Sequence, residues 1–322
     1  MAPSRLFVYA VLALAVLMIS TSPILAKLST APPPVLAAYR LGLAVLLMLP
    51  FYPLWGRGMR ARLSRRDWLY ALLAGFFLAW HFVVWFASLR YTSVASSTVL
   101  VTLQPLFSLV GAYWLFGERV GRRALAGVAL TLAGSLLIGW GDVRVGGMAF
   151  WGDVLALLGA ALVTAYWLIG QHVRQRLSLY AYTLLVYASS TLWLVGYAVV
   201  GGYPLFPYPM REWALFFLLA LLPTLLGHTL MNWLIRWVSA NVISMSILGE
   251  PVGAAFLAYW VFGEVPTWTQ FLGAALILGG IAWFLAVHRP ALPERRSEDP
   301  GEGVAARPAR PEPGADGGWR EA

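Results

Sequence analysis

The chain has 322 residues, of which 60% are hydrophobic and only 11% are charged, against about 45–50% and about 25% in ordinary soluble domains. This composition excludes a soluble globular protein and indicates one that lies in a lipid bilayer. The absence of cysteine excludes disulfides and thiolate metal sites. A net charge of +9 would suggest nucleic acid in a soluble protein. Here the basic residues lie between apolar runs, so we interpret them as topology signals and expect no nucleic-acid partner.

Ten apolar runs are long enough to cross a bilayer, which takes roughly 20 residues of helix. They cover about residues 5–27, 34–55, 68–89, 94–117, 122–141, 149–171, 179–201, 212–235, 241–263 and 267–288. The first run is too long for the apolar part of a secretion signal and lacks a clear cleavage site, so we keep it as a span. Residues 289–322 are rich in Pro, Gly, Arg and Glu, and we expect them to form a disordered cytoplasmic tail.

The distribution of Lys and Arg predicts the orientation, because loops that stay in the cytoplasm carry the excess of these residues. With the N-terminus inside, the cytoplasmic segments hold 18 of them and the outer segments hold 4, while Arg40 lies within the second span. The sequence therefore predicts a multi-pass protein of the plasma membrane, of the bacterial inner-membrane type, with both termini cytoplasmic.

A segment of the first half recurs in the second half without a gap, since residues 90–134 match residues 236–280 at an offset of 146. Each copy contains a Gln-Pro or Glu-Pro step, then AYWLFGE or AYWVFGE, which indicates a duplication. The two repeats, 1–141 and 142–288, hold five spans each, and an odd number inserts them in opposite orientations. Inverted repeats are typical of alternating-access transporters with a substrate site near the midplane. Duplicated bundles that act as channels or scaffolds remain an alternative.

Four stretches carry a family resemblance: AYRLGLAVLLMLP, LRYTSVASSTVLVTLQPLFSLVGAYWLFGE, WGDVLALLGAALVTAYW and VSANVISMSILGEPVGAAFLAYWVFGE. They closely resemble the drug/metabolite transporter superfamily, specifically its EamA-like ten-helix branch, and the likeness extends from residue 5 to residue 288. It implies a basket of helices with spans 5 and 10 outside, and spans 1, 3, 4, 6, 8 and 9 lining a central cavity with help from 2 and 7. The branch resembles exporters and importers of amino acids, nucleosides, sugars and drugs alike, so the likeness implies a small-molecule substrate without identifying it. We favour export over import, and we expect no cofactor or metal.

Charged side chains within spans are functional candidates, because a charge at the helix centre costs about 2.5–3.5 kcal/mol on insertion scales. Arg40 matches the span-2 arginine of the family that the chain resembles; it either serves the cavity or a gate, or extends outward to the interface. Glu250, buried in span 9, must be protonated or paired with a cation such as a histidine or a substrate amine. Its counterpart in the first repeat is the neutral Gln104.

Two histidines occupy nearly equivalent places in the repeats. His81 lies in span 3 with Trp85 one turn on, and His228 lies in span 8 with Asn232 one turn on. They either line the transport path, where a histidine suits proton coupling, or stay neutral and bond to a backbone carbonyl. The aromatic residues that could form a wall of the cavity are Trp80, Trp85, Tyr166 and Trp167.

Prolines within three spans predict interrupted helices, because proline frees a backbone carbonyl. Pro105 and Pro251 follow Gln104 and Glu250, and we expect a binding or hinge role there, with a plain kink as the alternative. For Pro23 in span 1 we favour the plain kink. Glu118 and Glu264 end spans 4 and 9 and are expected at the membrane interfaces. Small residues expected to allow close contact of spans 5 and 10 are Gly127, Gly134, Ala275 and Gly279.

Rival functions find little support in the sequence. An intramembrane enzyme would need catalytic groups, and neither HExxH nor GxSxG occurs. A passive pore or a lipid scramblase needs no titrating Glu250, so flux independent of pH and membrane potential would favour those alternatives. The sequence thus predicts a carrier of a small organic solute, and Glu250 makes proton coupling an option.

Overall fold

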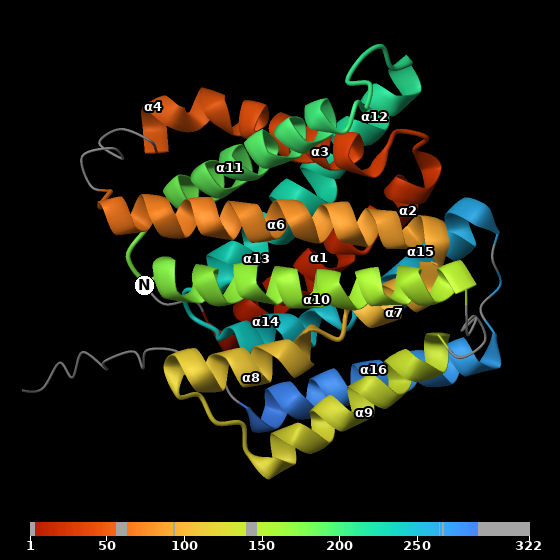
Figure 1. Cartoon of the computed structure of the whole chain (residues 1–322). Coiled ribbons are helices and arrows are strands. Elements are labelled where there is room, and N and C mark those ends of the chain that lie inside the picture. The colour runs from red at the N-terminus through yellow and green to blue at the C-terminus, as the bar shows by residue number, and fades with distance from the viewer. Residues whose placement is uncertain are drawn as a thin grey trace, which may run out of the picture.

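A computed structural model describes residues 4–55, 63–92, 94–139, 147–263, 265 and 267–288. Within these ranges every regular element is helical, and the long helices run roughly alongside one another as a bundle (Figure 1). The elements are α1 (Arg5–Ile19), α2 (Thr21–Leu28), α3 (Pro33–Met48), η1 (Leu49–Phe51), α4 (Tyr52–Trp55), α6 (Arg65–Tyr91), α7 (Val94–Val101), α8 (Gln104–Phe116), α9 (Arg122–Gly139), α10 (Gly147–Val173), α11 (Leu179–Val200), α12 (Met210–Leu219), η2 (Ala220–His228), α13 (Thr229–Leu234), α14 (Ala240–Ile247), α15 (Glu250–Phe262) and α16 (Trp268–Val287).

The described segments include eight that are long and apolar enough to cross a membrane, and a shorter apolar helix covers Phe271–Val287. These nine correspond to predicted spans 1–4 and 6–10. The remaining predicted span is present as helix α9 (Arg122–Gly139), which is not among these nine. The all-helical membrane fold is confirmed, and the count of ten spans stays a prediction. The expected disordered tail, 289–322, lies outside the described residues.

Three of the spans are interrupted near their middle. Span 1 turns at Ser20 between α1 and α2, span 4 breaks between α7 and α8, and span 9 breaks between α14 and α15. Pro105 and Pro251 each stand in the first turn of the helix after the break, where a residue without an N–H leaves no intrahelical bond unmade. The breaks of spans 1 and 9 touch, since Ser20 Oγ donates to the carbonyl oxygen of Glu250 at 3.3 Å.

Span 8 contains a π-helix, η2, between α12 and α13, with Pro223 inside it. Each π turn holds one residue more than an α turn, so the segment lengthens the sequence without lengthening the helix. Its effect is visible in the repeat: the acid-to-histidine separation is 14 residues from Asp67 to His81 and 16 from Glu212 to His228. The π-helix was not predicted, and its extra residues account for the longer separation between the acid and the histidine in the second repeat.

The two repeats begin at opposite ends of the bundle. In Figure 1, α1 and α6 start at the left, whereas α10, the first helix of the second repeat, starts at the right and runs back along α6. Contacts at both ends fix this antiparallel arrangement: Arg176, just after α10, binds Asp67 at the start of α6, and Gly152 near the start of α10 packs against Thr92 after α6.

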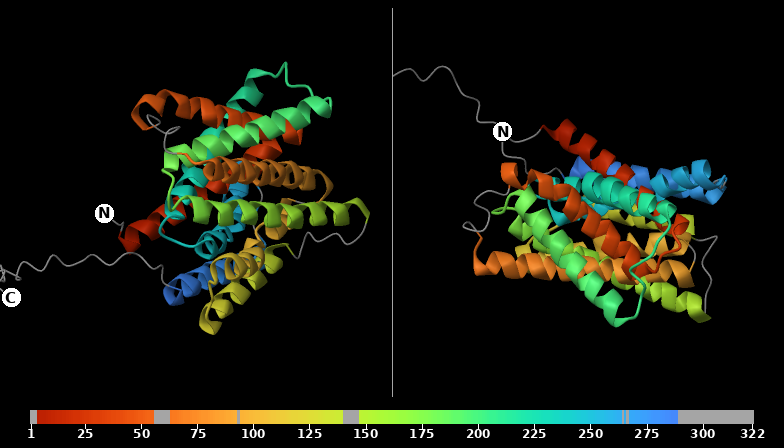
Figure 2. Two further views of the ribbon diagram at one scale, coloured as in Figure 1. Left: turned by 60° about the vertical axis from the view of Figure 1, so that its left-hand side comes forward. Right: turned by 90° about the horizontal axis from the view of Figure 1, so that it is seen from above.

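Helices α9 and α16 pack against each other along one edge of the bundle (Figures 1 and 2). A Cβ atom added to Gly127 or Gly134 would come within 2.9 or 2.6 Å of the backbone of α16, so the glycines allow direct contact of the two backbones. The predicted contact of Gly279 with α9 is wrong, because nothing lies within 4 Å of a Cβ atom added to Gly279. The contact belongs to Gly280, because one residue along a helix turns the side-chain position by about 100°.

Candidate functional site

A small cavity lies where the interrupted helices meet. Its lining comes from spans 1, 2, 3, 4, 6, 8 and 9, and therefore from both repeats. The lining residues are Ile19, Ser22, Arg40, His81, Phe82, Trp85, Val101, Gln104, Val163, Trp167, His228, Ile247 and Glu250. The free space is about 20 Å³, enough for about one water molecule. The helices are closed around the site in this conformation.

Arg40 is fully buried in α3 and is held by partners from both repeats. Its Nε donates to Thr224 Oγ1 of the π-helix at 2.8 Å, and its Nη1 donates to Ser22 Oγ of α2 at 2.7 Å. The guanidinium also lies over the ring of Phe82, 4.2 Å from the ring centre, a favourable cation–π contact. Its Nη2 has no hydrogen-bond partner among the described residues. The side chain thus points into the protein rather than outward to the interface.

His81 bonds to a backbone carbonyl and also lines the cavity, and its part in a transport path stays a prediction. Its Nδ1 lies 2.9 Å from the carbonyl oxygen of Gly159 on α10, so this nitrogen carries a proton and donates it to the carbonyl. The same ring stacks on Trp85 at 5.7 Å between centres and 16° between planes, and both residues line the cavity. The backbone bond fixes the orientation of the ring beside the cavity.

His228 also lines the cavity and lies at the end of the π-helix. It stacks on Trp167 with 5.4 Å between centres and 11° between planes, and its edge meets Phe82 at 5.8 Å. Each histidine therefore has an indole partner, His81 with Trp85 and His228 with Trp167. Phe82 lies between Arg40 and His228, so one aromatic ring links the cation to the second stacked pair.

Gln104 and Glu250 lie at equivalent places in the two repeats, each as the first residue of the helix after a break. They are 3% and 4% exposed, and Oε1 of each has no hydrogen-bond partner in the described part of the chain. The N-terminal end of a helix favours negative charge, which suits the carboxyl of Glu250. Arg40 lines the same cavity as Glu250.

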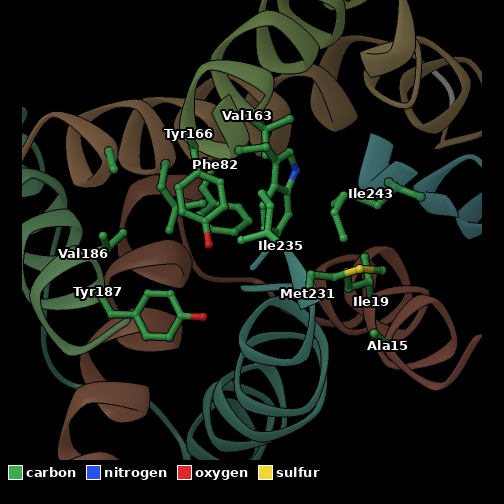
Figure 3. Close-up of a cluster of buried hydrophobic side chains, with 14 of the residues drawn as sticks. Ala15, Ile19, Phe82, Val163, Tyr166, Val186, Tyr187, Met231, Ile235 and Ile243 are labelled. Atoms are coloured by element: carbon green, nitrogen blue, oxygen red, sulfur yellow. The ribbon is translucent and has the colours of Figure 1, made fainter. Parts of the chain in front are cut away.

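Tyr166 and Asn232 lie beside the cavity rather than in its lining. Asn232 Nδ2 donates to the hydroxyl of Tyr166, and the Tyr166 ring also approaches His228, at 6.2 Å. Figure 3 shows Tyr166 and Tyr187 reaching toward the same space from α10 and α11. Trp80 faces elsewhere, against Phe76 and Tyr197, so its predicted place in the wall is wrong.

Six lining atoms lack a hydrogen-bond partner among the described residues: Arg40 Nη2, Trp85 Nε1, Trp167 Nε1, Gln104 Oε1, His228 Nδ1 and Glu250 Oε1. Buried polar groups are rarely left unpaired, and each such group calls for an explanation. In a membrane span the requirement is stricter still. Since the set contains both donors and acceptors, it fits a solute that carries groups of both kinds.

Recesses open at both ends of the bundle. One of about 470 Å³ is lined by Glu118, Arg236 and other residues at the end where α16 ends. Glu118 accepts hydrogen bonds there from Gln171 at 2.6 Å and Asn241 at 3.1 Å; its repeat counterpart Glu264 lies outside the described residues. Another recess, of about 200 Å³, lies at the opposite end beside Arg90. A further hollow, of about 630 Å³, is an apolar groove between α3 and α11 that lies outside the polar site.

Several buried polar residues escaped the sequence interpretation. Arg174 is 2% exposed and donates to the carbonyl oxygens of Asn232 and Leu177, although the sequence suggested only a cytoplasmic charge. Asp67 and Glu212, 4% and 1% exposed, were not singled out. Their nearly equivalent places, 145 residues apart at the start of spans 3 and 8, were a signal that could have revealed them.

A bundle of long apolar helices, with three of the spans interrupted next to a central polar cavity, is the architecture of a polytopic membrane transporter. The sequence profile of the EamA-like transporter family matches residues 6–140 and again residues 150–286. The chain belongs to the EamA-like transporter family, and the two matches agree with the duplication seen in the sequence.

Relatives with assigned names are transporters. The chain is 26% identical to an uncharacterized transporter of Archaeoglobus fulgidus, over 76% of this chain and 85% of that one. It is 30% identical to a riboflavin transporter of Rhizobium johnstonii, over 75% and 77% of the two chains. A probable terminal-alkyne amino-acid exporter of Streptantibioticus cattleyicolor is 26% identical over 64% and 68%. A solved structure, 20% identical, superposes with a TM-score of 0.73 over 89% of this chain and 99% of its own, which supports the fold.

Proposed function

We propose that the protein carries a small organic solute across the plasma membrane, with export favoured, by alternating access of two inverted five-helix repeats to the central cavity. The observation that supports this most is the set of unpaired polar atoms at the meeting point of the broken helices. Both repeats contribute to it, so a rocking motion of one repeat against the other would expose the same site to each side in turn.

The closed conformation favours a carrier over a pore. A pore needs a continuous passage, whereas the central space here is about 20 Å³ and is surrounded by stacked aromatic rings. A solute can enter only after the helices have moved apart, as alternating access requires. The same closure disfavours an intramembrane enzyme, which would have to admit both a substrate and water to catalytic groups.

The lining suggests the kind of solute. Arg40 Nη2 and the two indole N–H groups suit a carboxylate or another acceptor, because charge-assisted hydrogen bonds to arginine are the stronger ones. The unpaired oxygens of Gln104 and Glu250 suit an amine. A zwitterion such as an amino acid satisfies both sets, and its side chain would lie against the stacked rings. The relative named as an amino-acid exporter is consistent with this choice, while the relative named as a riboflavin transporter offers a larger aromatic solute.

Counterflow in proteoliposomes tests the proposal. Vesicles loaded with an unlabelled compound should accumulate the labelled form of the same compound transiently if the protein is a carrier, because influx and efflux share one site. A panel of amino acids, riboflavin and cationic drugs covers the chemistry discussed above. Flux without counterflow, unaffected by pH and membrane potential, would indicate a pore, and chemical conversion of the solute would indicate an enzyme.

A further inference from the structure

Two buried acids tie the repeats together at opposite ends of the bundle. Glu212 lies in the first turn of α12 and is 1% exposed. Its carboxylate accepts hydrogen bonds from Ser29 Oγ at 2.5 Å, from the backbone N–H of Thr30 at 3.0 Å and from Thr30 Oγ1 at 3.0 Å. Ser29 and Thr30 belong to the loop between α2 and α3, so an acid of the second repeat holds a loop of the first.

Asp67 makes the corresponding contact at the other end. It lies in the first turn of α6, where it forms a capping box with Ser64, and it is 4% exposed. Its Oδ1 binds Arg176 Nη2 at 2.7 Å. Arg176 belongs to the loop between α10 and α11, so here an acid of the first repeat holds a loop of the second.

The duplication relates these two contacts. At the offset of 146 residues Thr30 falls on Arg176, and Asp67 falls on position 213, next to Glu212. The single-residue difference lies in the span that contains the π-helix. In both cases the acid begins the third span of its repeat and reaches the loop between the first two spans of the other repeat. The starts of α12 and α6 lie at opposite ends of the bundle (Figure 1).

We propose that these contacts are two acid clamps that open alternately: the Glu212 clamp (Glu212 with Ser29 and Thr30) and the Asp67 clamp (Asp67 with Arg176). Opening the central cavity toward one end must separate the loop of one repeat from the third span of the other at that end, which breaks the clamp there. The clamp at the other end stays closed and holds the repeats together. This inference rests on the proposed alternating access and identifies the residues that govern it.

The two clamps differ in chemistry, which sets their strengths. The Glu212 clamp is buried, and its charge-assisted bonds from hydroxyl and amide donors are stronger than neutral hydrogen bonds. The exposed Arg211 also lies near this carboxylate, with 3.9 Å between its Nη1 and Glu212 Oε1. The Asp67 clamp is an ion pair whose arginine side chain is 52% exposed, and exposed ion pairs contribute little. Glu212→Gln should therefore shift the balance of open states toward its own end by about tenfold. Arg176→Gln should shift it toward the other end by about two- to fivefold.

The natural lack of cysteine makes the test direct. Val163→Cys places a single thiol in the cavity lining, where the residue is 2% exposed. A membrane-impermeant maleimide is added to right-side-out vesicles and, separately, to inverted vesicles that contain the full chain. Glu212→Gln should speed labelling from the face that carries the loop of residues 29–31 and slow it from the other face. Arg176→Gln should do the reverse.

Two further variants guard against misfolding and general loosening. Ser29→Ala weakens the Glu212 clamp without touching the acid and should act in the same direction as Glu212→Gln. Arg66→Gln removes an exposed charge next to Asp67, with the clamp intact, and should leave both labelling rates unchanged. Equal acceleration from both faces, or no change in either clamp variant, would overturn the alternating clamps.

The labelling test of the clamps and the counterflow test of the proposed function can fail independently. Counterflow of a solute together with unresponsive labelling would refute the clamps and leave the carrier intact. Opposite labelling shifts in a protein that shows no counterflow with any solute of the panel would support the clamps as a two-state device and reject the carrier.

Discussion

Replacing Arg40 by methionine should separate binding from stability. Two hydrogen bonds from the charged group are worth about 1.5–3 kcal/mol each, and the desolvated contact with Phe82 about 2 kcal/mol. Burial of the charge costs several kcal/mol, so the gains and the cost cancel to within a few kcal/mol. Thr224 keeps a partner without Arg40, because its hydroxyl also donates to the carbonyl oxygen of Leu219 at 2.8 Å. The free energy of unfolding should therefore change little or rise.

Solute affinity should respond very differently. Removing one partner of a buried charged pair costs about 2–5 kcal/mol, so Arg40→Met should weaken binding of a carboxylate-bearing solute by about 30-fold or more. The half-saturation concentration in counterflow measures the affinity, and thermal unfolding in detergent measures the stability. Unchanged affinity in a folded Arg40→Met protein would refute the binding role.

Arg174 is a matched control, since it is an equally buried arginine outside the cavity lining. Its partners are the backbone carbonyls of Asn232 and Leu177. Arg174→Met leaves these without their donor at about 1–3 kcal/mol each, so it should lower stability and leave the affinity of the remaining folded protein unchanged. The opposite pattern, with Arg40 needed for folding and Arg174 for binding, would contradict the assignment of the two arginines.

Three more substitutions probe other parts of the molecule. Glu250→Gln should abolish solute uptake driven by a pH gradient but retain counterflow. Asp153→Asn, which changes an acid outside the cavity lining, is the control and should retain both activities. Uptake driven by a pH gradient at the native rate in Glu250→Gln would reject proton coupling through Glu250. Trp85→Ala removes a stacked ring from the lining and should weaken solute affinity by about 3- to 10-fold. Equal half-saturation concentrations in the native protein and the variant would exclude a role of Trp85 in solute binding. Gly280→Ala should lower the unfolding temperature by forcing α16 away from α9, at about 1–3 kcal/mol. Gly279→Ala meets nothing within 4 Å and should be neutral or slightly stabilising; equal effects of the two glycine variants would contradict the packing.

Much of the site could be predicted because a polar side chain within a membrane span is costly to expose to lipid and therefore faces the protein interior. Arg40, His81 and Glu250 stand out for that reason, and the structure gathers them around one cavity; their part in transport remains a prediction. Proline chemistry likewise places the interruptions next to Pro105 and Pro251.

Other features depend on packing that one sequence does not reveal. The apolar pattern of span 8 gives no sign of the π-helix at Ala220–His228, which changes which residues share a face. Gly279 and Gly280 are adjacent glycines that the sequence does not distinguish, yet only Gly280 faces α9. Arg174 and Glu212 lie at span ends, where charged residues are ordinary, so their burial becomes apparent only when the loops and helices of the other repeat are in place.

The hydrogen bond between Arg40 and Thr224 joins residues 184 positions apart, and this bears on how the protein is made. When α3 leaves the ribosome, most of the chain that will surround the guanidinium of Arg40 has not yet been synthesised. A charge without polar partners is costly in hydrocarbon. Helix α3 should therefore remain beside the insertion machinery, or tilted toward water, until span 8 with η2 has been inserted. A half-length product would lack that shelter, and quality-control proteases should degrade it rapidly.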